Sequence, residues 1–85
     1  MELRTYCIRD AKAECFLTPF LKKTHGEAER DFTTLVNDDK SMVNKFPEDY
    51  DLYFIGTFCD QKGIYQCLDT PQHIVKAVQV LRKEQ

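Results

Sequence analysis

Basic side chains that could hold a phosphate backbone are concentrated near the start of the chain. Residues 4–23 contain five of the 12 Lys and Arg residues but only two acidic residues. The five basic residues are Arg4, Arg9, Lys12, Lys22 and Lys23. Because Lys and Arg neutralise phosphates when a protein binds nucleic acid, this segment is the candidate basic surface. The next candidate is the end of the chain, which carries Lys76, Arg82 and Lys83.

Aromatic residues in strand-like segments could supply the other half of a nucleic-acid interface. Tyr6, Tyr53 and Tyr65 lie in such segments, and tyrosine rings stack on unpaired bases. Tyr6 lies inside the basic segment, so we expect it, or a neighbouring strand aromatic, to offer the stacking face. The predicted single-stranded-DNA site consists of Arg4, Tyr6, Arg9, Lys12, Lys22 and Lys23.

The four cysteines do not have the spacing of a metal site. Cys7 and Cys15 are eight residues apart, as are Cys59 and Cys67. Zinc sites instead use close pairs such as C-x2-C. We expect reduced thiols that pack as small hydrophobic residues, with no disulfide framework, no metal and no cofactor.

The sequence also lacks a pattern typical of a catalytic site. His25 and His73 each fall in the first turn of a predicted helix, without a partner that would make a nucleophile–base pair. The acidic groups at 38–39 and 48–51 have no EF-hand spacing, and capping or turn roles explain them. The three glycines are isolated, so they form no phosphate-binding loop. We expect no catalytic residue and no enzymatic activity.

Composition limits the classes of protein to which the chain could belong. The net charge of −2 and pI of about 5.6 argue against a nucleic-acid binder that depends on its overall charge, so DNA binding would require a local basic patch. At 85 residues the chain has room for one domain, 1–85. No segment approaches the roughly 20 apolar residues of a membrane span, so we expect a soluble protein with no membrane partner.

The pattern of apolar and turn residues predicts two hairpins, each followed by a helix. Strands are expected at 3–9, 13–20, 50–59 and 64–68. Helices are expected near 25–37, begun by a Thr24–Glu27 capping box, and near 71–83, begun by Thr70-Pro71. The fold class is therefore α+β, a two-layer ββαββα sandwich with a four-stranded, mostly antiparallel sheet and two helices.

The same pattern predicts which residues are buried. They are Phe32, Leu35, Leu52, Phe54, Phe58, Ile74, Val78 and Leu81. Apolar residues alternate onto both faces of segment 50–59, which indicates a central strand. Two helices cover only one face of a sheet, so we expect a homodimer to cover the other.

A set of short motifs resembles a known phage family. They are Asp10-Ala11-Lys12-Ala13, Pro19-Phe20, Ala28-x-Arg30-x-Phe32, Val36-Asn37-Asp38, Pro47-Glu48-Asp49-Tyr50-x-Leu52-Tyr53-x-Ile55-Gly56 and Asp60-x-x-Gly63. In order and spacing the chain resembles the small non-structural protein of gokushoviruses, the single-stranded-DNA phages of the microvirus group. Gly56 of this motif is explained by the close approach of another backbone segment or of a helix.

The resemblance implies a function but carries over no catalytic residue. It implies a DNA-binding protein of the host cytoplasm that acts when the phage shifts from duplex replication to making and packaging single strands. The alternative is a protein–protein regulator that redirects a viral replication or capsid complex without touching DNA. Salt dependence separates the two hypotheses, because binding through phosphate contacts weakens steeply as salt rises.

Overall fold

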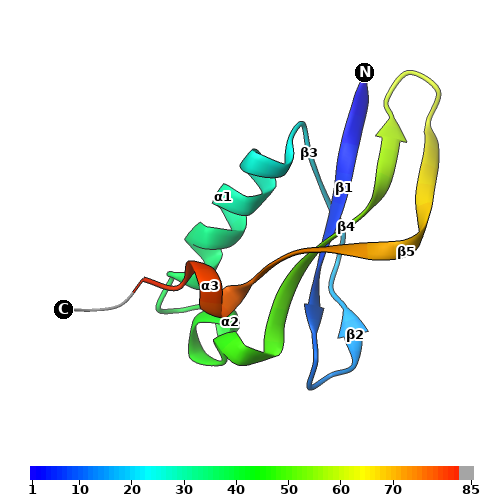
Figure 1. Cartoon of the computed structure of the whole chain (residues 1–85). Helices are drawn as coiled ribbons and strands as arrows, with labels where there is room; N and C mark the ends of the chain where they lie inside the picture. The colour runs from blue at the N-terminus through cyan, green and yellow to red at the C-terminus, as the bar shows by residue number, and fades with distance from the viewer. Residues whose placement is uncertain (83–85) are drawn as a thin grey trace.

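The computed structural model describes residues 1–82 and contains an antiparallel sheet with short helices beside it (Figure 1). In chain order the elements are β1 (Glu2–Asp10), β2 (Cys15–Phe16), β3 (Phe20–Lys22), α1 (His25–Val36), α2 (Met42–Lys45), a 3-10 turn η1 (Pro47–Asp49), β4 (Tyr50–Cys59), β5 (Ile64–Lys76) and α3 (Ala77–Val80). The predicted α+β class is confirmed.

The sheet has the strand order β2-β1-β4-β5, and β3 also pairs with β1. Every pair is antiparallel. β2 pairs with the end of β1 through Arg9 and Phe16, whereas β3 pairs with its beginning through Tyr6 and Phe20. β2 and β3 are therefore two pieces of one returning strand. Pro19, which has no N–H for a ladder, lies in the gap and interrupts the strand expected at 13–20.

The helices α1, α2 and α3 all lie on one side of the sheet (Figure 1). Alternation along β1 and β4 directs Tyr6, Ile8, Leu52 and Phe54 into the core beneath α1. Ala28, Phe32 and Val36 of α1 complete that core. The opposite face of the sheet, which we call the open face, carries no helix among the described residues. None of the described helices is both long and apolar enough to cross a membrane.

Helix α1 begins where the sequence predicted. The Thr24 hydroxyl accepts a hydrogen bond from the Glu27 N–H at 3.1 Å, and the Glu27 carboxylate accepts one from the Lys23 N–H at 3.1 Å. The first bond satisfies an amide group that a helix start leaves without a partner, and the second ties the residue before the cap to the first turn. The carboxylate also lies at the positive end of the helix dipole.

Replacing Thr24 with alanine should lower the free energy of unfolding by about 1 kcal/mol, because the helix loses its side-chain cap. Thr34→Ala is the matched control, since Thr34 is exposed in the middle of α1 and its hydroxyl bonds only to the Arg30 carbonyl. We expect a change within about 0.5 kcal/mol there. Urea unfolding of both variants measures the difference, and equal losses would contradict the capping role.

The prediction of a last helix at 71–83 is wrong. Residues up to Lys76 continue β5, where Lys76 pairs with Asp51 and Val75 with Leu52, and only Ala77–Val80 is helical. Thr70 and Pro71 therefore start no helix. The apolar spacing that suggested a helix belongs to a bulged strand. Val75 pairs with Leu52 and His73 pairs with Tyr53, so Ile74 is the extra residue of the bulge. Consequently the ββαββα two-layer arrangement is not fully reproduced, and Lys83 lies outside the described residues.

Six of the eight predicted core residues belong to the core or pack against it. Phe32, Leu52 and Phe54 are buried, and three more pack against the core while partly exposed, namely Leu35, Ile74 and Leu81. Phe58 is only half-buried, because it lies on the part of β4 beyond the helices. The prediction that Val78 is buried is wrong. Val78 is 45% exposed, since the short helix α3 does not bring it against the core.

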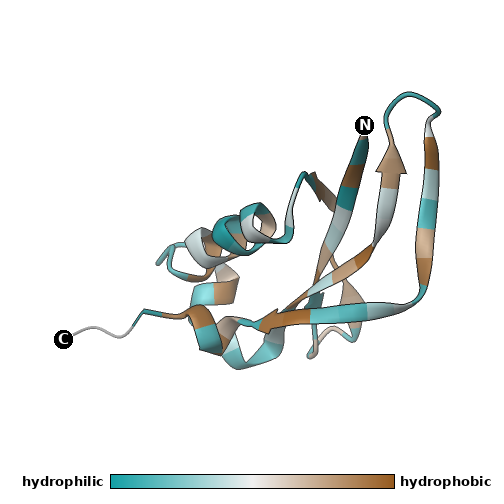
Figure 2. Cartoon of the chain, turned by 45° about the horizontal axis from the view of Figure 1, so that its top comes forward, coloured by the Kyte–Doolittle hydropathy of each residue, from teal (hydrophilic) through white to brown (hydrophobic). Residues whose placement is uncertain are grey.

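The outer part of the β4–β5 hairpin projects beyond the helices, which makes the molecule elongated at 47 × 25 × 19 Å. Hydrophobic residues lie on both strands of this projection (Figure 2). Gly63 closes the turn at φ +68°, the left-handed conformation that glycine adopts without a steric penalty. At Gly56 a Cβ atom would lie 2.4 Å from the Gln66 carbonyl oxygen, so the expected close backbone approach is confirmed.

Candidate nucleic-acid interface

Three aromatic side chains form a row across the open face of the sheet. Phe16 of β2, Tyr53 of β4 and His73 of β5 have ring centroids 5.3 Å apart at each step, with neighbouring rings nearly perpendicular. Strand pairing explains the row, because Tyr53 is opposite His73 and alternates with the buried Leu52 and Phe54. We call Phe16, Tyr53 and His73 the aromatic row.

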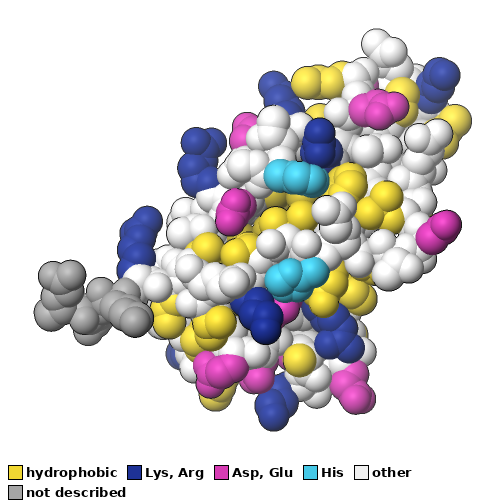
Figure 3. All heavy atoms as spheres, viewed as in Figure 1, with side chains coloured by type: hydrophobic (Ala, Val, Ile, Leu, Met, Phe, Trp, Pro, Cys, Tyr) yellow, Lys and Arg dark blue, Asp and Glu magenta, His cyan; other side chains and the backbone are white. Residues whose placement is uncertain are grey.

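The aromatic row is partly open to solvent. Phe16 is 41% exposed, Tyr53 is half-buried, and the His73 side chain is 39% exposed. Figure 3 shows both histidines at the surface in this view, with hydrophobic and charged side chains near them. Partly exposed rings fixed by edge-to-face contacts can accept a base on a free ring face without losing much side-chain entropy.

Charged groups flank the aromatic row. The Arg9 guanidinium lies 5.8 Å from the centre of the Phe16 ring, and the His73 Nε2 atom lies 2.7 Å from an Asp51 carboxylate oxygen. Arg9 and Lys76 are the β1 and β5 partners of Asp51, so all three lie at the same end of the open face. Lys12 is exposed in the turn between β1 and β2. Arg9 and Lys76 could hold phosphates beside a stacked base.

The six predicted site residues do not gather on one surface. Arg9 and Lys12 lie at the open face and its adjoining turn, but Arg4 is on the helix side, 6.0 Å from the centre of the Phe54 ring. Lys22 forms an ion pair with Asp31 of α1. Lys23 is exposed just before α1. The arrangement therefore places one of the five predicted cations, Arg9, beside the aromatic row, whereas Lys12 shares a surface cavity with Met42 and Phe46.

Tyr6 cannot be the stacking residue, because its side chain is fully buried. Its ring is 0% exposed and contacts Phe20 and Phe54 at centroid distances of 5.8 and 5.5 Å. Burial raises the pKa of its hydroxyl, while nearby Arg4 opposes that shift. The alternation of Tyr6 with Ile8 on β1 was the sequence signal for a core position.

A family model for "Phage ORF5 protein" matches residues 3–80 of the chain. The chain belongs to the Phage ORF5 protein family. It is therefore a protein of a bacteriophage family. No curated protein and no solved structure matches it.

His25 of this Phage ORF5 protein links β1 to α1 instead of lying free on a helix surface. An Arg4 guanidinium nitrogen lies 3.3 Å from Nε2, and the Tyr6 hydroxyl contacts Nδ1. Arginine can only donate, so Nε2 accepts, and the imidazole is neutral with its Nδ1–H donated to the Tyr6 oxygen. Burial, with a smaller contribution from Arg4, lowers the pKa of His25.

The lowered pKa of His25 predicts a pH dependence of stability. As the pH falls below the ordinary value of 6.5, an unfolded His25 gains a proton that the native one does not. The free energy of unfolding should therefore decrease from roughly pH 7.5 to roughly pH 5.5. Urea unfolding should show a smaller decrease in His25→Gln, whose amide can still bond to Tyr6. An unchanged slope in that variant would contradict the assignment.

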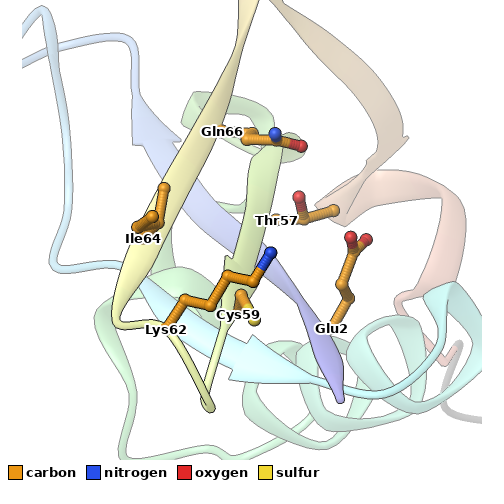
Figure 4. Close-up of a pocket in the computed structure, with 6 residues that line it drawn as sticks. All are labelled: Glu2, Thr57, Cys59, Lys62, Ile64 and Gln66. Atoms are coloured by element: carbon orange, nitrogen blue, oxygen red, sulfur yellow. The ribbon is translucent and has the colours of Figure 1, made fainter.

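A surface depression on the outer hairpin and the four cysteines offer little chemistry. A depression of about 140 Å³ lies on the outer hairpin, where side chains from β1, β4, β5 and the intervening turn surround a common space (Figure 4). It is lined by Glu2, Thr57, Cys59, Lys62, Ile64 and Gln66. All four cysteines are free thiols. Within residues 1–82 no group of three or more His, Cys, Asp or Glu side chains is placed to hold a metal.

Sequence reasoning missed two members of the aromatic row. Phe16 follows the first hairpin turn directly, and its place opposite Arg9 could have been found by counting the strand register back from that turn. His73 was assigned to a helix that is absent, so its strand partner Tyr53 could not be recognised. Tyr53 itself was among the three tyrosines that the sequence identified.

Proposed function

We propose that this phage protein binds single-stranded DNA on the open face of its sheet and has no enzymatic activity. The resemblance to the small non-structural protein of gokushoviruses supports a role in the host cytoplasm. There it would act when the phage shifts from duplex replication to the synthesis and packaging of single strands. A viral replication or capsid protein is a further partner under this proposal.

The observation that carries the proposal is the aromatic row beside Arg9. Phe16, Tyr53 and His73 lie on three different strands, so a chain of nucleotides can cross the sheet and meet one ring after another. Stacking on aromatic rings tolerates any base, because every base has a π face. The row therefore suits single strands, whose bases are free, and not duplex DNA, whose bases are paired and stacked.

The distribution of charge favours the open face over the helix face. Helix α1 carries Glu27, Glu29 and Asp31 but only one basic residue, Arg30. Phosphates would be repelled there. On the open face Arg9 and Lys76 outnumber Asp51, while in the adjoining turn the charge of Lys12 is offset by that of Glu14. Because the whole chain has a net charge of −2, affinity should depend on this local set and fall as salt screens it.

One feature favours the alternative, a regulator that binds protein. A groove of about 370 Å³ between β3 and α1 is lined mainly by apolar side chains. They are Ile8, Phe20, Leu21, Phe32 and Leu35. Such a groove suits an apolar segment of a replication or capsid protein.

A fluorescence anisotropy titration with single-stranded and duplex DNA, each at low and physiological salt, tests the proposal. We expect single-stranded DNA to bind more tightly than duplex of the same length, with an affinity that falls steeply as salt rises. Absence of DNA binding at low salt would reject the proposal and leave the protein-binding alternative. Equal affinity for duplex would reject the stacking mechanism.

A further inference from the structure

The outer half of β5 is an unprotected sheet edge. β5 is the last strand in the sheet order, so one side of it has no neighbour within the described residues. Its 13 residues make it the longest strand, and residues 64–73 are all exposed. A free edge of this kind presents unpaired N–H and C=O groups in a row, which is a template for another strand.

The inner half of β5 and the opposite edge of the sheet carry features that discourage such pairing. Residues 69–76 include Asp69, Pro71 and Lys76, and the pairing with β4 is interrupted by bulges on both sides of Gln72. The opposite edge is broken into the short strands β2 and β3 around Pro19. Ile64–Leu68, with the sequence Ile-Tyr-Gln-Cys-Leu, has no charge and no proline, and Ile64–Cys67 pairs with β4 in one continuous register.

We propose that two copies of this chain pair antiparallel through Ile64–Leu68 about a two-fold axis at Gln66. Pairing about this axis sets Ile64 opposite Leu68 of the second copy, and Tyr65 opposite Cys67. Ile64 and Tyr65 are each 53% exposed and Leu68 is 39% exposed, so each exposed apolar side chain gains an apolar neighbour.

Other registers that keep the sheet faces continuous are poorer. An axis at Tyr65 would set Leu68 opposite Lys62, and an axis at Cys67 would set Tyr65 opposite Asp69. The segment is thus complementary to itself, and a second copy is the occupant that its chemistry fits.

The pairing has a consequence that rests on the proposed function. A two-fold axis perpendicular to the sheet leaves both open faces on the same side, so the dimer would offer two aromatic rows to one DNA strand. The effective concentration of the second row would raise the affinity for long oligonucleotides over short ones.

Sedimentation velocity without DNA, in the presence of a thiol reductant, tests the pairing. We expect the wild-type chain at high micromolar concentration to have twice the mass of 10.0 kDa. Gln66→Lys and Gln66→Glu each place two like charges opposite each other on the axis and should weaken the dimer about fivefold or more. An equimolar mixture of the two variants should restore it. Thr34→Lys, which adds the same charge on the exposed side of α1, should leave it unchanged.

Disulfide crosslinking between two copies tests the same pairing without introducing a charge. Gln66→Cys should form an intermolecular disulfide between the introduced thiols on mild oxidation, because opposite residues of antiparallel strands are about 4.5–5.5 Å apart. A monomeric wild-type protein would overturn the proposal, and so would a dimer that both charged variants leave intact. Since DNA is absent, failure here is distinct from failure of the proposed function.

Discussion

Replacing Phe54 with alanine is expected to lower the free energy of unfolding by about 3–5 kcal/mol. Phe54 is 9% exposed and lies where β1, β4 and the start of α1 meet. Its ring centre is 5.5 Å from that of Tyr6 and 5.0 Å from that of His25. Removing it would leave a cavity that these rigid aromatic neighbours cannot fill. Small domains have little stability in reserve, so the loss could exceed half of the total.

Val78→Ala is the control, because sequence and structure disagree about this residue. Apolar spacing placed Val78 in the core, whereas the folded chain leaves it 45% exposed on α3. We therefore expect its substitution to change the free energy of unfolding by no more than about 0.5 kcal/mol. Chemical denaturation of both variants measures the contrast. A large loss for Val78→Ala would contradict the short last helix.

Replacing Tyr53 with alanine is expected to weaken binding of single-stranded DNA by about 1–3 kcal/mol. Tyr53 is the central ring of the aromatic row and contacts both Phe16 and His73. Its removal would also release those two rings from their edge-to-face contacts. Tyr53→Phe keeps the ring and should bind nearly as well as the wild type. Equal loss in both variants would point to the hydroxyl and not to stacking.

Arg9 offers a matched test of the phosphate contacts. Arg9→Ala should weaken binding to all base sequences alike. It should also reduce the slope of log affinity against log salt concentration by about one, the contribution of one phosphate contact. Lys23→Ala removes an equally basic side chain on the other side of the molecule, where it is exposed before α1. Anisotropy titrations of the two variants at several salt concentrations compare the two surfaces. A larger effect of Lys23→Ala would move the site to the helix side.

Local signals were enough to predict much of the fold. Thr24 with Glu27 marked the start of α1, and alternation marked β4 as a central strand with Leu52 and Phe54 inside. The extension of β5 to Lys76 could not be predicted, because Ile74 and Val75 fit a helical stripe as well as a bulged strand. Pairing with β4 over a long sequence distance decides between them, and spacing along the chain does not contain that information.

The candidate site was predicted less well than the fold. Sequence reasoning placed Arg9 in the right region, but it could not tell which face of a strand the helices would cover. That choice buries Tyr6 and leaves Tyr53 partly exposed. It also separates Arg4 and Lys22 from Arg9, because neighbours on a strand point to opposite faces and Lys22 binds Asp31.

Amide chemical-shift mapping with a short oligothymidine tests the central claim, DNA binding on the open face, most directly. We expect the largest chemical-shift changes on titration at the amides of Arg9, Phe16, Tyr53 and His73. The amides at exposed positions of α1 should keep their chemical shifts. Shifts concentrated on Arg4, Lys22 and Lys23, or no shifts at low salt, would contradict it.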